Sequence, residues 1–394
     1  MKPAFFRRGL VRLALLAGVV SAGAMAASPA CARAQDTVKV GHYASMTGSE
    51  ATFGKSTDNG IRLAIKEINA AGGLGGKKID LITYDDKSDG KEAGNAVTRL
   101  ITQDKVVAIL GEVASSRSLA GGQVAEQYGV PMITPSSTNP AVTRNKKMVF
   151  RVCFIDPVQG AALATFVKDN LKLTKAAILY DQTQTYSKGL RDDFARAFKK
   201  MGGAVVSDQA YSAGDSDFSA QLSTIRSANP EIILIPGYYT EGGNIAIQAR
   251  RMGITAPLIG GDGWDSAQLT AIGGRAIEGA YYSNHSSPDQ PQMKDFVQKY
   301  KAEFGETPDA LGGLGYDAMM VLFEAMKRAP SLESKALAAA IAQTKNFKGV
   351  TGNISIDKDH NATKAVVIVQ VKNGQPTYVA AVEPPAEDGE NGGN

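Results

Sequence analysis

The sequence predicts an α/β protein whose strands run parallel within a sheet. From Thr37 onward, short apolar runs alternate with longer amphipathic runs, which is the pattern of successive strand and helix units. Several short runs are apolar throughout, as strands covered on both faces are. A chain of 394 residues is long enough for two or three domains of about 150 residues each. Such units form either one barrel or two doubly wound lobes, and composition alone does not distinguish these folds.

The predicted strands are the short apolar runs, taken in chain order. They lie at residues 38–43, 79–84, 106–110, 132–134, 176–180, 232–235 and 258–259. A further strand-like run covers residues 149–154. Periodicity therefore places most of these strands in regular alternation with helices.

Amphipathic helices are predicted between the strands, because apolar residues recur there at helical spacing. Ile61, Ala64 and Ile68 share one face of the first helix, and Phe194 and Phe198 share one face of a later helix. Helix-stopping residues follow four of these segments, at residues 72–73, 202–203, 229–230 and 253. Glycine and Asn-Pro at these places indicate where each helix ends.

The composition excludes several classes of protein. With 43% apolar and 21% charged residues, the chain is not a disordered tail, a collagen-like repeat or a polytopic membrane protein. The formal net charge is +4, but residues 1–34 hold five basic residues and no acidic one. The remainder carries 38 basic against 39 acidic residues. A charge near zero without a basic cluster argues against nucleic acid as a partner.

The N-terminus is predicted to be an export signal that covers residues 1–34. Basic residues occur between positions 2 and 12, and they precede an apolar run at 13–27 that is too short to span a bilayer. We favour cleavage after Ala34, because the first strand pattern begins near Thr37. The mature protein is therefore expected to be soluble and outside the cytoplasm.

Two features of the ends leave alternatives open. Arg7-Arg8 is compatible with a twin-arginine route, and Cys31 with lipidation, although Ser28-Pro29-Ala30 is a poor sequence to precede a lipidated cysteine. After cleavage only Cys153 remains, so no intrachain disulfide is possible, and a buried structural thiol is expected. Residues 383–394 are rich in Pro, Gly and acid and are predicted to form a flexible tail.

Two sequence patterns resemble known binding loops without matching them. Gly48 and Gly54 are separated by five residues, whereas a phosphate-binding loop has four, so we expect an ordinary strand-to-helix loop that borders a ligand cleft. Asp357-x-Asp359-x-Asn361 resembles the start of a calcium loop, yet Ala362 stands where that loop needs Gly. We therefore predict a surface turn there.

No catalytic or metal motif is present in the sequence. His42, His285 and His360 occur singly, which gives no zinc pattern, and no Gly-x-Ser-x-Gly elbow occurs. We therefore expect no enzyme activity, no metal and no cofactor.

Polar residues cluster after two consecutive buried strands, where open α/β sheets bind ligands. The segment 110–118 contains Ser115, and its serines are predicted to cap the next helix, whose dipole suits a carboxylate. The segment 134–140 contains Ser136 and Thr138, and its hydroxyls and carbonyls are expected to face outward. Ordinary helix capping would explain the polar residues of either segment alone. It explains less readily why such segments follow two consecutive strands.

In the later half, aromatic residues and an acid follow successive strands. Tyr186 follows one strand, Tyr238 the next, and Asp262 and Trp264 the one after. One interpretation is that Tyr238 and Trp264 only pack between lobes. The functional interpretation is a second wall, with rings for an apolar group and Asp262 for a cation.

These motifs, taken in order, resemble the leucine/isoleucine/valine-binding family of periplasmic proteins from about residue 37 to 380. The motifs are Met46-Thr47-Gly48, Phe53-Gly54, Tyr84-Asp85-Asp86, Ser115-Ser116, Thr134-Pro135-Ser136-Ser137-Thr138, Tyr186, Gly237-Tyr238 and Gly260-Gly261-Asp262-Gly263. The resemblance implies a type I periplasmic binding fold, with two doubly wound parallel-sheet lobes joined by three crossovers near Asp156, Ser283 and Asp357. It assigns residues 37–156 and 284–357 to the first lobe, and 157–283 and 358–382 to the second.

The resemblance also implies a set of ligand-binding residues. Ser115 and Thr138 would bind the ligand carboxylate, while the Ser136 carbonyl, the Thr138 hydroxyl and Asp262 would meet its ammonium. Tyr186 and Tyr238 would close over the ligand.

Three further residues are expected to shape the side-chain pocket, namely Phe53, Val113 and Trp264. The family usually has Glu where Asp262 stands, and Ser88 and Ala114 replace a disulfide found in some members. Trp264 and Arg117 also depart from the pattern; we expect Arg117 to be exposed, although it could reach a second acidic group on the ligand.

The function implied by the resemblance is capture of a neutral, branched-chain amino acid and its delivery to an ABC permease and its ATPase subunits. Two alternatives remain open. The same fold could bind an aromatic acid, an amide or urea, or the protein could be an exported receptor that signals through a membrane sensor. An exported hydrolase is disfavoured, because no nucleophile and base were found.

Overall fold

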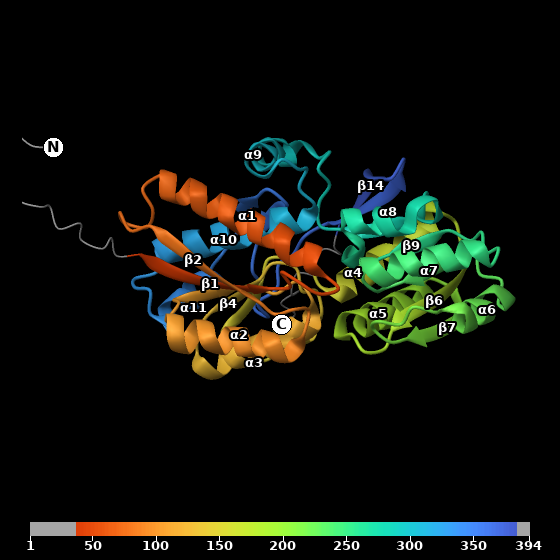
Figure 1. Ribbon diagram of the computed structural model, residues 1–394, viewed down its shortest axis with the longest axis horizontal. Helices are drawn as coiled ribbons and strands as arrows, with labels where there is room; N and C mark the ends of the chain where they lie inside the picture. The colour runs from red at the N-terminus through yellow and green to blue at the C-terminus, as the bar shows by residue number, and fades with distance from the viewer. Residues whose placement is uncertain (1–36, 384–394) are drawn as a thin grey trace, which may run out of the picture. The chain divides into compact units, whose positions relative to one another are not determined.

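A computed structural model describes residues 37–383 of the chain (Figure 1). The strands are β1 Val38–Ala44, β2 Ile79–Asp85, β3 Ala108–Leu110, β4 Met132–Thr134, β5 Val149–Arg151, β6 Lys175–Asp181, β7 Ala204–Tyr211, β8 Ile232–Ile235, β9 Leu258–Gly260, β10 Tyr281–Asn284, β11 Phe347–Gly349, β12 Gly352–Ile354, β13 Val366–Lys372 and β14 Gln375–Val382. The helices are α1 Ala51–Ala70, α2 Gly90–Arg99, α3 Ser115–Tyr128, α4 Asp156–Thr165, α5 Thr185–Lys200, α6 Ser219–Ser227, α7 Tyr239–Arg251, α8 Ala267–Gly273, α9 Lys294–Phe304, α10 Ala310–Arg328 and α11 Ser334–Ala342.

The strands form two large sheets and one small hairpin. The first sheet has the order β2-β1-β3-β4-β5 and is parallel throughout. The second has the order β14-β13-β10-β9-β8-β6-β7, and β11 pairs only with β12. In each sheet the strand order reverses near the first strand of the series, which is the arrangement that creates a ligand crevice at the carboxyl ends.

Helices cover both faces of the first sheet. Figure 1 shows α1 and α10 on one side of it, with α2 and α3 on the other. The backbones of α1 and α10 approach closely, because a side chain at Gly60 would collide with the carbonyl of Gly312. The apolar face predicted for α1 is confirmed, since Ile61, Ala64 and Ile68 are all buried.

The predicted strands are found, and the bounds of β4 and β8 are those expected from the sequence. All four predicted stops also hold, since α1, α5, α6 and α7 end within two residues of them. Six strands had no predicted range: β7, β10, β11, β12, β13 and β14. β7 carries Ser207, Asp208 and Gln209 in its middle, and β10 ends in Ser283 and Asn284, so neither is an apolar run.

The second sheet differs from the predicted parallel arrangement at one edge. β13 pairs antiparallel with β10, and β14 pairs antiparallel with β13. The β13–β14 pair follows from the turn that joins these two strands, where Asn373 and Gly374 have positive φ angles of 52° and 71°. Asn-Gly favours a two-residue hairpin, which joins only antiparallel strands.

The remaining structural predictions can be placed as follows. Cys153 is fully buried, as expected, and burial raises the pKa of its thiol to about 12. Asp357 accepts hydrogen bonds from the amides of Asp359 and Asn361, which gives the predicted turn. The signal, its cleavage site and residues 384–394 lie outside the described residues, and the lobe boundaries stay a prediction. No helix within residues 37–383 is long and apolar enough to cross a membrane.

Candidate functional site

The loop after β4 is buried and held in place by hydrogen bonds, so the prediction that its polar groups face outward is wrong. Ser136 and Thr138 are 2% and 1% exposed. Ser137 Oγ donates to the Val113 carbonyl at 2.8 Å. Arg151 donates to the carbonyls of Ser137 and Asn139. The loop turns inward because Arg151 and neighbouring loops supply the partners that solvent would otherwise provide. The Ser136 hydroxyl has no hydrogen-bond partner.

The start of α3 also differs from the prediction. Its N-cap is Ala114, and no side chain caps the helix. Ser115 Oγ accepts from the amide of Asn139 at 3.2 Å, and Ser118 Oγ accepts from the amide of Glu112 at 3.1 Å. These serines therefore join α3 to the neighbouring loops instead of capping it.

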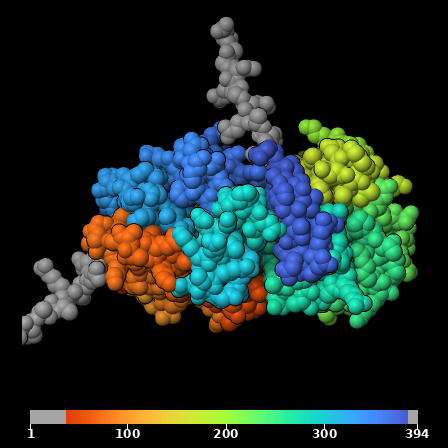
Figure 2. All heavy atoms as spheres, turned by 90° about the horizontal axis from the view of Figure 1, so that it is seen from above, coloured from red at the N-terminus to blue at the C-terminus, as the bar shows by residue number. Residues whose placement is uncertain are grey.

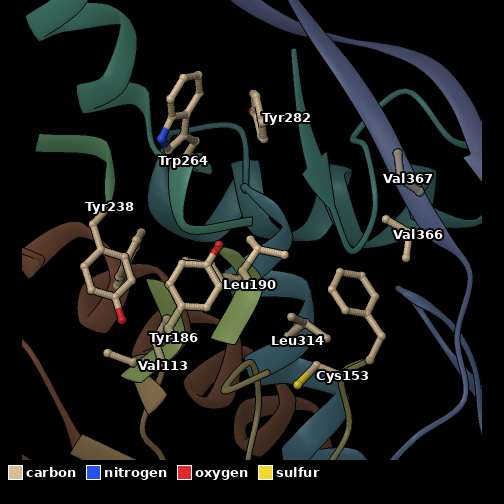
Figure 3. Close-up of a cluster of buried hydrophobic side chains, with 14 of the residues drawn as sticks. Val113, Cys153, Tyr186, Leu190, Tyr238, Trp264, Tyr282, Leu314, Val366 and Val367 are labelled. Atoms are coloured by element: carbon tan, nitrogen blue, oxygen red, sulfur yellow. The ribbon is translucent and has the colours of Figure 1, made fainter. Parts of the chain in front are cut away.

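Two tyrosines of the second lobe form a parallel stack at the seam with the first lobe. The rings of Tyr186 and Tyr238 lie 5.5 Å apart with an interplanar angle of 7°. Phe53 of α1 meets Tyr238 edge-on at 5.6 Å, so the stack touches the first lobe. Figure 3 shows Val113 beside this ring pair, and Val113 is buried. Four of the nine predicted residues are thus brought together around one apolar wall.

Asp262 lies behind this wall with both carboxylate oxygens engaged. The Tyr186 hydroxyl donates to Oδ1 at 2.8 Å, and His285 Nε2 lies 3.0 Å from Oδ2. Burial lowers the pKa of His285 even though Asp262 favours its protonation. His285 also stacks on Phe154, with ring centroids 4.0 Å apart. A neutral imidazole leaves the negative charge of Asp262 uncompensated.

Helix α4 connects the two walls. The Asp156 amide donates to the Thr138 carbonyl at 2.9 Å. Gln159 Oε1 accepts from the Asp262 amide at 3.0 Å and from Ser283 Oγ at 2.7 Å. Burial raises the pKa of Asp156. The Thr138 side chain lowers this pKa, and the proximity of Asp262 raises it. Helix α4 therefore joins the loop of Thr138 to the segment of Asp262, and their sharing of one ligand stays a prediction.

Trp264 is placed differently from the other aromatic residues. It is fully buried, and a Cβ atom at Gly242 would lie 2.7 Å from its Nε1. Figure 3 shows its indole next to Tyr282, on the opposite side of the tyrosine stack from Val113. This packing favours the interpretation of Trp264 as a core residue of the second lobe, and its contact with a ligand stays a prediction.

Arg117 is buried, which corrects the expectation that it is exposed. Its side chain is 2% exposed, and Nη1 lies 2.9 Å from Glu50 while Nε lies 3.2 Å from Glu112. Asp86 is a further neighbour, and burial together with Glu112 raises its pKa to about 8. We call these four residues the Arg117 cluster. Glu50 and Asp86 are distant from Arg117 in the sequence, so the α3 segment, with Glu112 as its only acid near Arg117, gave no sign of the cluster.

Sequence reasoning missed three polar residues of this region: Asp156 as a side chain, Gln159 and His285. His285 directly follows β10, and this strand was not predicted because it ends in polar residues. Recognising β10 would have placed His285 at the same sheet edge as Asp262. Within residues 37–383, no group of three or more His, Cys, Asp or Glu side chains is arranged to hold a metal ion.

Comparison with known proteins identifies the family. The family model described as periplasmic binding protein matches residues 37–376, which is most of the chain. The chain belongs to the periplasmic binding protein family. The leucine-, isoleucine-, valine-, threonine-, and alanine-binding protein of Pseudomonas aeruginosa is 31% identical over 355 residues, covering 89% of this chain and 93% of that protein.

Two solved structures support the fold of this periplasmic binding protein. The leucine-binding protein LivK of Thermotoga maritima is 43% identical, with a TM-score of 0.85, over 88% of this chain and 99% of that chain. The branched-chain amino acid transporter substrate-binding protein LivJ of Streptococcus pneumoniae, in complex with isoleucine, is 34% identical, with a TM-score of 0.84, over 89% of this chain and 100% of that chain. The predicted family and the two-lobed α/β class are confirmed.

Proposed function

We propose that this protein captures a neutral, branched-chain amino acid between its lobes and delivers it to an ABC importer. The observation that carries the proposal is the meeting of an acid and unpartnered hydrogen-bonding groups at one buried seam. Asp156 has both Asp262 and Thr138 as neighbours, and the hydroxyls of Thr138 and of Ser136, two residues before it, have no hydrogen-bond partner. A zwitterion offers both the cation and the anion that such a seam accommodates.

The ammonium group would bind at Asp262, the Ser136 carbonyl and the Thr138 hydroxyl. Asp262 suits this role because His285, its closest ionisable partner, has a lowered pKa and is neutral near pH 7. Burial raises the pKa of Asp156, and in its protonated form this carboxyl group adds no negative charge that would compete with Asp262 for the ammonium. The ligand carboxylate would bind at Ser115 and Thr138.

The side chain of the ligand would lie against the apolar wall of Phe53, Val113, Tyr186 and Tyr238, and Trp264 is proposed to shape its far end. Micromolar affinity needs about −8 kcal/mol. Charge-assisted hydrogen bonds of roughly 1.5–3 kcal/mol each, with one buried aliphatic side chain, are sufficient for that affinity.

Closure of the lobes would enclose the ligand. Contacts already join the two sides: Thr52 Oγ1 lies 2.9 Å from Ser266 Oγ, and Ser116 Oγ donates to Gln184 at 3.0 Å. Ligand entry and release would break these hydrogen bonds as the lobes rotate about the crossovers. We further propose export to the periplasm with cleavage after Ala34, and a permease with its ATPase subunits as partners.

The experiment that tests this function is calorimetry with leucine, isoleucine and valine, beside two carboxylates that lack the amine. The first is 4-methylpentanoate, which is leucine without its amino group, and the second is benzoate. We expect micromolar binding of at least one amino acid and at least 100-fold weaker binding of 4-methylpentanoate. Tight binding of benzoate with none of the amino acids would instead establish the aromatic-acid alternative.

A further inference from the structure

A second pocket, of about 430 Å³, lies apart from the proposed ligand site. None of the nine residues predicted to bind the ligand lines it. Asp265 and Tyr282 line one side and belong to the second lobe, whereas Asp309 lines the other side and caps α10. Gln375, the first residue of β14, is exposed and also lines the pocket, and Figure 2 shows β14 in dark blue.

All the charged residues that line this pocket are acidic. Its lining includes Asp265, Asp289 and Asp309 but no Lys, Arg or His. Asp265 Oδ2 accepts from the Ala310 amide at 2.8 Å, and Asp309 Oδ1 accepts from the Gly312 amide at 2.9 Å. The amino end of a helix supplies only about half a positive charge. The start of α10 therefore compensates two carboxylates incompletely.

No Lys, Arg or His side chain among the lining residues completes this balance. Burial, followed by the proximity of Asp309, raises the pKa of Asp265 to about 8. Burial also raises the pKa of Asp309, to about 6, and Glu306 adds a further negative charge nearby. Ser287 lines the same pocket, is fully buried, and its hydroxyl has no hydrogen-bond partner. With pKa values of about 8 and 6, Asp265 holds a proton at neutral pH and Asp309 carries the negative charge of the pair. This charge and the unpartnered Ser287 hydroxyl are the features that a bound cationic group would satisfy.

The shape of the pocket distinguishes between kinds of cation. Its volume far exceeds that of a metal ion, and no cluster of three metal-ligating side chains occurs in the part of the chain that is described. The lining also includes the apolar residues Leu269, Val369 and Val371. A short hydrocarbon chain can lie against these residues while a charged end group reaches the carboxylates.

We propose that this pocket binds a small alkylammonium ion, with its ammonium group between Asp265 and Asp309 and its hydrocarbon chain against the apolar lining residues. The bound ion would connect α10 of the first lobe to the segment of the second lobe that precedes α8. This site is separate from the proposed amino-acid site and does not depend on it.

The probe is n-butylammonium chloride, titrated into the mature protein at constant ionic strength and followed by calorimetry. n-Butanol serves as the neutral analogue of the same length. We expect saturable binding of n-butylammonium and at least tenfold weaker binding of n-butanol. Asp309→Asn keeps a cap acceptor for α10 but removes the charge, and should weaken n-butylammonium binding at least tenfold. Equal affinity for the two probes would overturn the proposal.

A matched pair of variants at the exposed rim carries little risk to folding. Gln375→Lys places a cation at the mouth and should weaken n-butylammonium binding severalfold, whereas Gln375→Glu should strengthen it. Tyr186→Phe removes a hydroxyl from the other site and should leave this affinity within twofold. Identical affinities for the two Gln375 variants, or a loss in Tyr186→Phe as large as that in Asp309→Asn, would refute binding in this pocket.

Discussion

The two lobes keep buried acids at their seam in different ways. In the first lobe, the single guanidinium of Arg117 forms ion pairs with Glu50, Glu112 and Asp86. In the second lobe, Asp262 is held by the neutral hydroxyl of Tyr186 and by His285. The first arrangement already contains its cation, and the second does not. This difference is the basis of the proposal that Asp262 binds a ligand's positive charge, and it predicts that the Arg117 cluster acts on the stability of the fold instead.

The largest effect is expected in the Arg117 cluster. Arg117→Met leaves three buried carboxylates without their cation, so the free energy of unfolding at pH 7 should fall by about 3–5 kcal/mol. Chemical denaturation measures this change. The double variant Arg117→Met/Glu50→Gln should lose less than the sum of the single losses, because one unpaired charge is also removed. Strict additivity would contradict a direct interaction between Arg117 and Glu50.

The corresponding change in the second lobe should act on binding more than on folding. Asp262→Ala removes the proposed partner of the ligand ammonium and should weaken amino-acid binding by about 100-fold, which corresponds to about 2.7 kcal/mol. Calorimetry tests this, with Asp80→Ala as a control that removes an exposed carboxylate from β2. Unchanged affinity in Asp262→Ala would remove Asp262 from the site.

The pH dependence of stability should report the crowding of acids in the Arg117 cluster. Asp86 has a folded pKa of about 8, above the value of about 4 expected in the unfolded chain. Between these values the folded state binds more protons, so its stability should fall as pH rises, by up to about 1.4 kcal/mol per pH unit. Asp86→Asn should flatten this slope in denaturation curves measured from pH 4 to 8. The same slope in both proteins would contradict the raised pKa.

The smallest effect is expected at the stacked tyrosines, which offer a matched comparison. Tyr186→Phe removes the hydroxyl that donates to Asp262 and should weaken ligand binding severalfold, or about 1 kcal/mol. The Tyr238 hydroxyl has no hydrogen-bond partner, so Tyr238→Phe should change the affinity less than twofold. Titration calorimetry on both variants distinguishes them. A larger loss in Tyr238→Phe would mean that this hydroxyl contacts the ligand.

Elements with strong local signals were predicted well. The strands at residues 132–134 and 232–235 are apolar throughout, and their bounds in the structure are the predicted ones. β7 and β10 were missed because polar residues interrupt them, and their pairing depends on neighbouring strands. A local apolar pattern indicates a strand that is buried on both faces. β7 at the sheet edge and β10 between β13 and β9 are instead stabilised by partner strands that lie elsewhere in the sequence.

The sequence by itself determined the α/β class, the strands that are apolar throughout, and the candidates Phe53, Tyr186, Tyr238 and Asp262. Only the tertiary structure decided the surroundings of these residues. It buried Arg117 among acids, turned the loop of Ser136 and Thr138 inward, and placed His285 against Asp262. The physical reason is the separation along the chain between the residues that interact. Periodicity and turn chemistry act over a few neighbouring residues, whereas charge compensation and hydrogen bonding join groups that the fold brings together from distant segments.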